Sequence, residues 1–270
     1  MILDYAEYIE DGKHSSPRGY SEAKNPTFFS QKRWCPFCNV PTQEVADEKE
    51  EQRVSTIDER GVMRSAQLCA CGWWQTNYYE WRNDSGFEWD DYGARHAILR
   101  RYEPADSELP VATLRRALIK KPDLIHQIGK RKTEELVGSI FADYYDCDVR
   151  MVGKSSDGGF DLVLVLSDRH CLVQVKNRER NSKRWRAEPV STVREFLGAF
   201  LLADGQNGIL VTTADHFSKQ AKEAAAKAIT RDDVRQYDLI DGGELLRTLN
   251  LTSTRVNEHW RQNLVFAIKQ

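Results

Sequence analysis

The segment DGGFDLVLVLSDRHCLVQVKN, residues 157–177, is the most informative part of the chain. Two apolar runs, residues 160–166 and 171–175, flank the polar stretch Ser-Asp-Arg-His at 167–170, and this pattern predicts a β-hairpin. Gln174 lies inside the second run and Lys176 directly follows it. These two residues are two positions apart, so on a strand they project to the same face, and the hairpin can bring Asp161 beside them.

These three side chains suit the hydrolysis of a phosphodiester bond, which needs a divalent cation to bind the scissile phosphate and lower the pKa of an attacking water. Mg²⁺ prefers oxygen ligands, and Asp161 offers a carboxylate while Gln174 offers an amide carbonyl. Lys176 can hold the water or stabilise charge that builds up on phosphorus. An aspartate followed by Gln-x-Lys is also common on exposed hairpins. The apolar strand, where an unpaired charge is costly, and the adjacent Gly158-Gly159, which lets a ligand approach the backbone, favour the catalytic interpretation.

The surrounding sequence predicts an α/β domain from Arg131 onward. Helices are expected over 133–145, from a capping box formed by Thr192 and Glu195, over 218–229 and over 244–249, and further strands over 149–152, 208–212 and 237–240. The predicted order is therefore αβββαβαβα. Before this domain, residues 111–128 are predicted to form a helical connector that Pro122 breaks.

Seven elements in this order resemble the catalytic domain of Mrr-type restriction endonucleases, within the PD-(D/E)xK nuclease superfamily. They span residues from about Pro122 to Leu249. The matching segments are Thr133-Glu-Glu-Leu-Val137, Asp157-Gly-Gly-Phe-Asp161, Gln174-Val-Lys176, Val193-Arg-Glu195, Gly208-Ile-Leu-Val-Thr-Thr213, Phe217-Ser218 and Leu239-Ile-Asp-Gly242. The resemblance implies a restriction-endonuclease-like αβββαβ core. It also implies that Asp161, Gln174 and Lys176 are catalytic, with Gln in place of the usual acidic residue.

The resemblance further implies a glutamate from the first helix, which falls on Glu134. The family usually has Phe before that glutamate, and Thr133 stands there in this chain, so Glu135 is the alternative. Glu134, Asp161 and Gln174 would hold Mg²⁺. The implied activity is that of a Mg²⁺-dependent endodeoxyribonuclease in restriction or anti-phage defence. Two alternatives remain: a catalytically silent nucleic-acid-binding or complex-assembly module on the same fold, and an RNA-directed nuclease.

Four of the six cysteines form two close pairs, Cys35-Pro-Phe-Cys38 and Cys69-Ala-Cys71, followed by Gly72. Thiolates with this spacing can close a tetrahedral Zn²⁺ site, and the segment resembles a zinc ribbon, although a single residue separates the second pair. We predict a structural Zn²⁺ on which the folding of this region depends. Two disulfides or four reduced cysteines are the alternatives.

Five aromatic residues follow the second cysteine pair directly, namely Trp73, Trp74, Tyr78, Tyr79 and Trp81. They are expected to fill the core of the metal domain, and base stacking or a cage for a modified base is the alternative. Residues 1–110 carry 13 basic and 20 acidic side chains, whereas residues 111–270 carry 26 and 21. The acidic balance of the first part argues against general DNA binding there, so docking of a protein partner is a serious alternative for this region.

The chain is therefore predicted to contain a β-rich zinc-ribbon-like recognition or docking domain at 1–108, a helical connector at 109–130, an Mrr-like nuclease domain at 131–250 and a tail at 251–270. Residues 1–30 are rich in polar and turn-forming residues, and irregular structure is expected there. Glu59-Arg60-Gly61 is expected to turn a hairpin, and residues 63–81 are expected to form strand.

The composition of the whole chain indicates a soluble globular protein. It has 270 residues, of which 40% are hydrophobic and 30% charged. It contains no apolar run near the roughly 20 residues that span a bilayer, and its first ten residues lack the basic start and apolar stretch of a secretory signal. We expect a cytoplasmic protein whose partner is DNA and not a membrane. Cutting both strands favours a homo-oligomer, because one such site cuts one strand.

Overall fold

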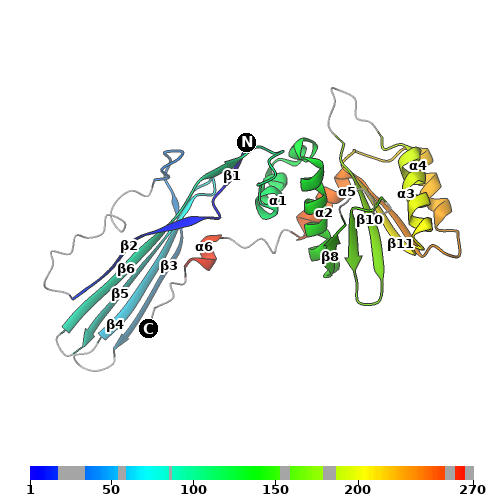
Figure 1. Ribbon diagram of the computed structural model, residues 1–270. Helices are drawn as coiled ribbons and strands as arrows, with labels where there is room; N and C mark the ends of the chain where they lie inside the picture. Colours follow the sequence, from blue (N-terminus) through cyan, green and yellow to red (C-terminus); the bar gives the residue numbers. More distant parts are fainter. Residues whose placement is uncertain are drawn as a thin grey trace. The chain divides into compact units, whose positions relative to one another are not determined.

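The chain divides into two compact units in this computed structural model (Figure 1). The structure describes residues 1–17, 34–53, 59–84, 87–152, 159–178, 187–252 and 259–264. One unit comprises Met1–Ile2 and Tyr102–Val256 and is called the α/β unit below; the other comprises Leu3–Arg101 and Asn257–Gln270 and is called the β unit. Within the described ranges, none of the helices has the length and apolar character that crossing a bilayer requires.

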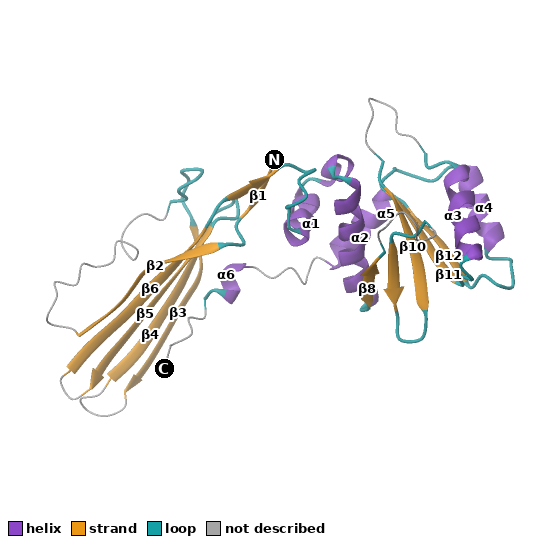
Figure 2. Cartoon of the chain, viewed as in Figure 1, coloured by secondary structure: helices purple, strands orange, loops and turns teal. Residues whose placement is uncertain are grey.

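The α/β unit is built on a five-stranded mixed sheet with the strand order β12-β11-β10-β9-β8 (Figure 2). Its strands are β8 (Asp148–Met151), β9 (Leu162–Val165), β10 (His170–Lys176), β11 (Asn207–Thr212) and β12 (Gln236–Ile240). The first three are antiparallel, whereas β10, β11 and β12 run parallel. The helices are α1 (Val111–Lys120), the 3-10 helix η1 (Pro122–Gln127), α2 (Lys130–Tyr145), α3 (Val190–Leu202), α4 (Lys219–Ala228) and α5 (Gly242–Thr252). From α2 onward this order confirms the predicted αβββαβαβα succession.

Each face of this sheet is covered by its own apolar layer. Val173 and Val175 of β10 belong to the core that α1, α2 and α5 close on one face. Leu172 packs on the opposite face, against the layer formed with α3 and α4. Side chains alternate along a strand, so Gln174 and Lys176 continue the Leu172 side at the end of β10. The predicted polar pair therefore lies where the apolar layer on the α3 side ends.

Two predicted helix starts in this unit differ from the structure. The helix expected from residue 133 begins at Lys130, after Gly129. The capping box predicted for Thr192 and Glu195 is wrong, because α3 begins at Val190 after the extended Pro189 and no side chain caps it. The Thr192 hydroxyl instead donates a hydrogen bond of 2.6 Å to the carboxylate of Glu188. The hydroxyl that the local sequence predicted as a helix cap therefore binds the buried carboxylate of Glu188.

Arg115 of α1 joins three helices of the α/β unit. Its buried guanidinium donates to Asp143 and to Ser139 Oγ at 2.9 Å, both on α2, and to Thr252 Oγ1 at 2.9 Å on α5.

We expect Arg115→Ala to lower the free energy of unfolding of this unit by about 2–4 kcal/mol, because these partners lose their donor. Lys120→Ala, at the exposed end of α1, should change it by no more than about 0.5 kcal/mol. Urea denaturation measures both, and equal effects would contradict the assignment.

The β unit contains a five-stranded antiparallel sheet with the order β2-β6-β5-β4-β3, which confirms the predicted β-rich N-terminal region. Its strands are β2 (Tyr8–Pro17), β3 (Gln43–Arg53), β4 (Glu59–Leu68), β5 (Trp74–Asp84) and β6 (Phe87–Ala97), while β1 (Ile2–Asp4) pairs with β7 (Arg100–Tyr102). The short helix α6 (His259–Gln262) packs on this sheet, where Trp260 and Leu264 join a buried cluster with Trp73 and Trp74.

Three expectations for the β unit require correction. Irregular structure over residues 1–30 is wrong for β1 and β2; β2 is an edge strand whose polar residues pair with β6, with a register shift between Asp11 and His14. Glu59-Arg60-Gly61 do not form a turn, since they pair with both β3 and β5. The connection between β3 and β4 falls at residues 54–58, outside the described residues. The strand expected over 63–81 is two strands, β4 and β5, with the second cysteine pair between them.

Candidate active site and cysteine cluster

Asp161 is fixed at the start of β9 by two hydrogen bonds to β10. Its backbone N–H donates to the carbonyl oxygen of Val173 at 2.9 Å, which extends the ladder by one residue beyond the Leu162–Val173 pair. Its carboxylate oxygen Oδ2 then accepts the N–H of Val175 at 2.7 Å. The carboxylate thus accepts a backbone N–H of β10 that a carbonyl oxygen would accept in a regular ladder. This hydrogen bond holds it against β10 beside Gln174.

Gln174 is buried, and its two amide atoms have different surroundings. Nε2 donates to the carbonyl oxygen of Gly159, while Oε1 is buried without a hydrogen-bond partner among the described residues. Gly159 has φ of +87°, a conformation that favours glycine, and this turn directs its carbonyl to Gln174. Leaving a buried acceptor unpaired costs about 1–3 kcal/mol. An oxygen in this state is expected where a ligand completes its surroundings. The neighbouring Asp157 and Gly158 lie outside the described residues.

Lys176 is the last residue of β10 and is partly buried. Its backbone pairs with Thr212 in the parallel ladder, and its carbonyl oxygen accepts the N–H of Thr213 at 3.1 Å. In the part of the chain that the structure describes, no carboxylate forms an ion pair with Lys176. The backbone of this lysine is therefore fixed, while none of the described carboxylates pairs with its ammonium group.

Glu134 reaches the same region from α2 and is 6% exposed. The ammonium of Lys130 lies 3.7 Å from Glu134 Oε1 and 4.0 Å from Asp161 Oδ1, while Arg131 Nη1 lies 3.4 Å from Glu134 Oε2. Burial raises the pKa of Glu134, and the negative charge of Asp161 raises it further, whereas Lys130 and Arg131 oppose the shift. Glu135, the alternative, instead pairs with Lys132 at 2.7 Å.

The donor set of this site fits a hard divalent cation. Two carboxylates, from Glu134 and Asp161, share the ammonium of Lys130, so the space between them already favours a positive charge. The unpartnered amide oxygen of Gln174 adds a third oxygen. Carboxylate and carbonyl oxygens are the ligands that Mg²⁺ and Ca²⁺ take in proteins. Sequence reasoning missed Lys130, although its spacing of four residues from Glu134 on a helix would place the two side by side.

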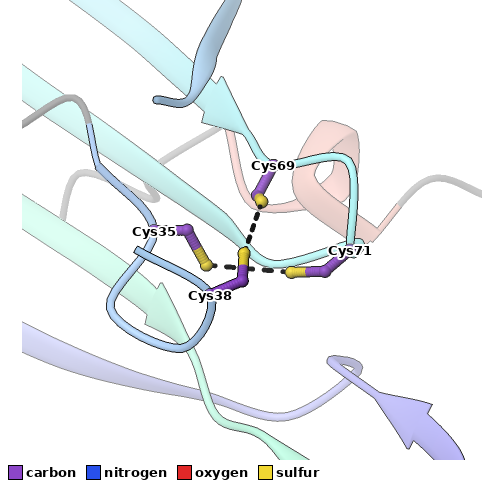
Figure 3. A group of neighbouring side chains, drawn as sticks. All are labelled: Cys35, Cys38, Cys69 and Cys71. Carbon is purple, nitrogen blue, oxygen red and sulfur yellow. Dashed lines mark hydrogen bonds between the residues drawn. The ribbon is translucent and has the colours of Figure 1, made fainter. Parts of the chain in front are cut away.

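The four paired cysteines come together at one end of the β unit (Figure 3). Cys35 Sγ lies 3.7 Å from Cys71 Sγ, Cys38 Sγ lies 3.3 Å from Cys69 Sγ, and all four sulfurs lie within 4.8 Å of one another. A tetrahedral zinc ion with Zn–S bonds of about 2.3 Å separates its sulfurs by about 3.8 Å. The arrangement is therefore compatible with zinc. All six cysteines are free, so the alternative of two disulfides does not describe this structure.

Each cysteine pair lies in a tight turn that ends on a residue with positive φ. Asn39, with φ of +51°, donates its N–H to Cys35 O at 3.0 Å, and Gly72, with φ of +103°, donates to Cys69 O at 2.8 Å. The hydroxyl of Tyr5 donates to Cys71 Sγ at 3.3 Å. Contact with the other thiols, with Cys69 first, raises the pKa of Cys38 to about 12. A bound cation would reverse this effect by stabilising the thiolates.

The five aromatic residues after the second pair divide between the two faces of the sheet. Trp73, Trp74 and Tyr78 are 4%, 2% and 7% exposed, which confirms a core role for these three. Tyr79 and Trp81 lie on the other face of β5, are partly exposed, and stack with their ring centroids 5.5 Å apart. The base-stacking interpretation therefore applies only to Tyr79 and Trp81, for which it stays a prediction.

The comparison with protein families places its match in the α/β unit. The model of a restriction endonuclease family, Mrr_cat, matches residues 125–249, which contain Glu134, Asp161, Gln174 and Lys176. Solved structures similar to the chain include restriction endonuclease FokI, with 13% identity and a TM-score of 0.37 over 58% of this chain and 31% of that one. FokI bound to DNA matches with 12% identity and a TM-score of 0.36, over 58% and 30%. The chain thus covers about a third of the FokI chains. No curated protein sequence matches it.

Proposed function

We propose that the restriction endonuclease domain of the Mrr type formed by residues 125–249 is a divalent-metal-dependent endonuclease that hydrolyses DNA phosphodiester bonds. One observation carries the proposal. The carboxylates of Glu134 and Asp161 flank a single ammonium, from Lys130, and Asp161 is held beside the buried, unpartnered Oε1 of Gln174. These oxygens supply the ligands that Mg²⁺ requires.

Each residue has a defined role in the proposed reaction. Glu134, Asp161 and Gln174 would hold Mg²⁺, which supplies a polarised phosphate and a water of lowered pKa when bound. The hydrogen bond from Val175 N–H orients the Asp161 carboxylate in advance. Lys176 positions the water or stabilises the negative charge on phosphorus. Lys130 would have to leave the two carboxylates for them to hold a divalent cation, because its positive charge would repel the ion.

We further propose that Cys35, Cys38, Cys69 and Cys71 hold a structural Zn²⁺ in the β unit, supported by the compact arrangement of their sulfurs. In this proposal the β unit is the recognition or docking domain, and residues 131–250 of the α/β unit, with residues 109–130 packed against them, are the nuclease domain. The β unit selects the target through DNA or protein contacts. The protein acts in the cytoplasm, in restriction or anti-phage defence, and cuts both strands as a homo-oligomer.

Plasmid cleavage tests the proposed activity. Supercoiled DNA incubated with the full chain and Mg²⁺ should be nicked or linearised, and a chelator should stop the reaction because the carboxylates then have no ion to hold. RNA of matched sequence should remain intact, and plasmid with and without methylated bases shows whether modification is required. Binding of DNA without cutting in Mg²⁺ or Mn²⁺ would favour the silent binding module, and digestion of RNA alone would favour the RNA-directed nuclease.

A further inference from the structure

A completely buried glutamate lies next to the proposed catalytic strand. Glu188, 0% exposed, precedes α3 and accepts hydrogen bonds from Arg178 Nε at 2.9 Å and from Arg178 Nη2. Two hydroxyls complete its surroundings, Thr192 Oγ1 at 2.6 Å and Thr212 Oγ1 at 2.8 Å. Burial alone would raise the pKa of Glu188, but the hydrogen bonds, first that from Arg178, hold this pKa below its usual value. The pair is therefore an ion pair.

This ion pair lies on the face of the sheet that carries Lys176. Thr212 stands opposite Lys176 in the parallel ladder of β10 and β11, and its hydroxyl binds Glu188. Arg178 follows Lys176 by two residues, and its backbone N–H donates to Thr213 Oγ1 at 2.7 Å. Both the backbone and the guanidinium of Arg178 are thus fixed directly beyond the end of the strand.

The fixed guanidinium has one side that Glu188 does not use. Nε and Nη2 of Arg178 face the carboxylate, whereas Nη1 has no hydrogen-bond acceptor among the described residues, and 46% of the side chain is exposed. A guanidinium carries five N–H donors in a rigid planar fork. Its outer N–H groups match the oxygens of a phosphate, and a charge-assisted hydrogen bond of this kind is among the strong ones.

We propose that Arg178, held by the buried Glu188, binds a backbone phosphate of the nucleic acid next to the scissile one. This inference rests on the proposed nuclease function. Arg178 is then a positioning residue: it fixes the strand relative to Lys176 and does not take part in bond cleavage. Ordering the guanidinium through Glu188 before substrate arrives reduces the entropy lost on binding.

The test removes both charges of the pair at once. Arg178→Ala alone would leave Glu188 buried without its partner and would destabilise the fold. Arg178→Met combined with Glu188→Gln keeps the net charge of the chain. Binding of a duplex oligonucleotide in Ca²⁺ should become about tenfold weaker at the same salt concentration. The slope of log affinity against log salt concentration should become shallower by about 0.9. The variant makes one phosphate contact fewer, so its binding releases fewer counterions.

A matched control is the exposed pair Arg231–Asp233, whose side chains are 51% and 57% exposed. Arg231→Met with Asp233→Asn makes the same change in charge and should keep wild-type affinity and slope. Arg178→Lys is the second test variant. This variant keeps a cation beside Glu188, so the fold is retained. It removes the guanidinium N–H groups that face away from Glu188, so DNA affinity and its salt dependence should fall as in the double variant.

The outcomes separate this inference from the proposed function. Wild-type affinity and slope in both Arg178 variants would overturn the role of Arg178 while DNA cleavage by the unaltered chain stands. Absence of DNA binding and cleavage by the unaltered chain would overturn both. Calorimetric binding of Mg²⁺ should be the same in all proteins, because Arg178 and Glu188 do not touch the proposed metal ligands. A loss of metal binding together with DNA binding would assign Arg178 a structural role and contradict the proposal.

Discussion

Lys176→Ala is expected to lower the rate of DNA cleavage by about 100- to 1000-fold, the loss that follows removal of one group that stabilises transition-state charge. Lys176 ends β10 with its carbonyl oxygen bound by Thr213 N–H, and within the described residues it makes no ion pair. The substitution therefore removes a charge from the site without breaking an ion pair among the described residues. Thermal stability and Mg²⁺ affinity should remain close to those of the unaltered protein.

Single-turnover cleavage of plasmid with enzyme in excess isolates this effect from binding. Lys219→Ala is the control, because it removes the same charge from the same unit. Lys219 lies at the start of α4, and its side chain is 87% exposed. Its rate should stay within about twofold of the unaltered protein, since an exposed lysine away from the site contributes little. Equal cleavage by the Lys176→Ala protein, at matched purity, would mean that the active site is assigned wrongly.

The hairpin and its surroundings could be predicted because local signals agree there. Two apolar runs separated by a polar tip predict β9 and β10, and spacing alone places Gln174 and Lys176 on one face. The sequence did not show in the same way which residues of α2 face the site. Glu134 and Glu135 are adjacent in sequence, and their side-chain exposures of 7% and 31% separate them only in the folded domain. The contacts of Lys130 with Glu134 and Asp161 were not predicted either, because α2 begins at Lys130, before the apolar residues that indicate the helix.

The failures of prediction lie where pairing is distant in sequence. Residues 8–17 contain Gly12, two serines and a proline, a composition typical of loops, and they become strand through pairing with β6 some 80 residues away. Glu188 carries no motif in the sequence. Its importance appears only when Arg178, Thr192 and Thr212, from three separate segments of the chain, meet around it. Local propensity does not encode contacts of this kind.

The second large effect is expected in the β unit. Cys69→Ser should abolish Zn²⁺ binding, because it removes one of four thiolate ligands from the site. Binding of a structural zinc contributes about 10–16 kcal/mol, which exceeds or equals the stability of a typical domain, so the β unit should lose its fold. Trp73 and Trp74 are buried in the same cluster as Cys35 and Cys69, and their near-ultraviolet circular dichroism should report that loss.

Two further variants show whether the loss of zinc is specific to the four cysteine ligands. Cys147→Ser removes a thiol of the α/β unit and should keep one zinc per chain. Tyr5→Phe keeps all four ligands but removes the hydrogen bond to Cys71 Sγ, so zinc affinity should fall by about 10- to 100-fold while the sheet still folds in excess metal. Metal analysis of protein purified without chelator decides the matter. Less than about half an equivalent of zinc in the unaltered chain, with no change in its melting on chelation, would contradict a structural site, because the four thiols would then hold the sheet without an ion.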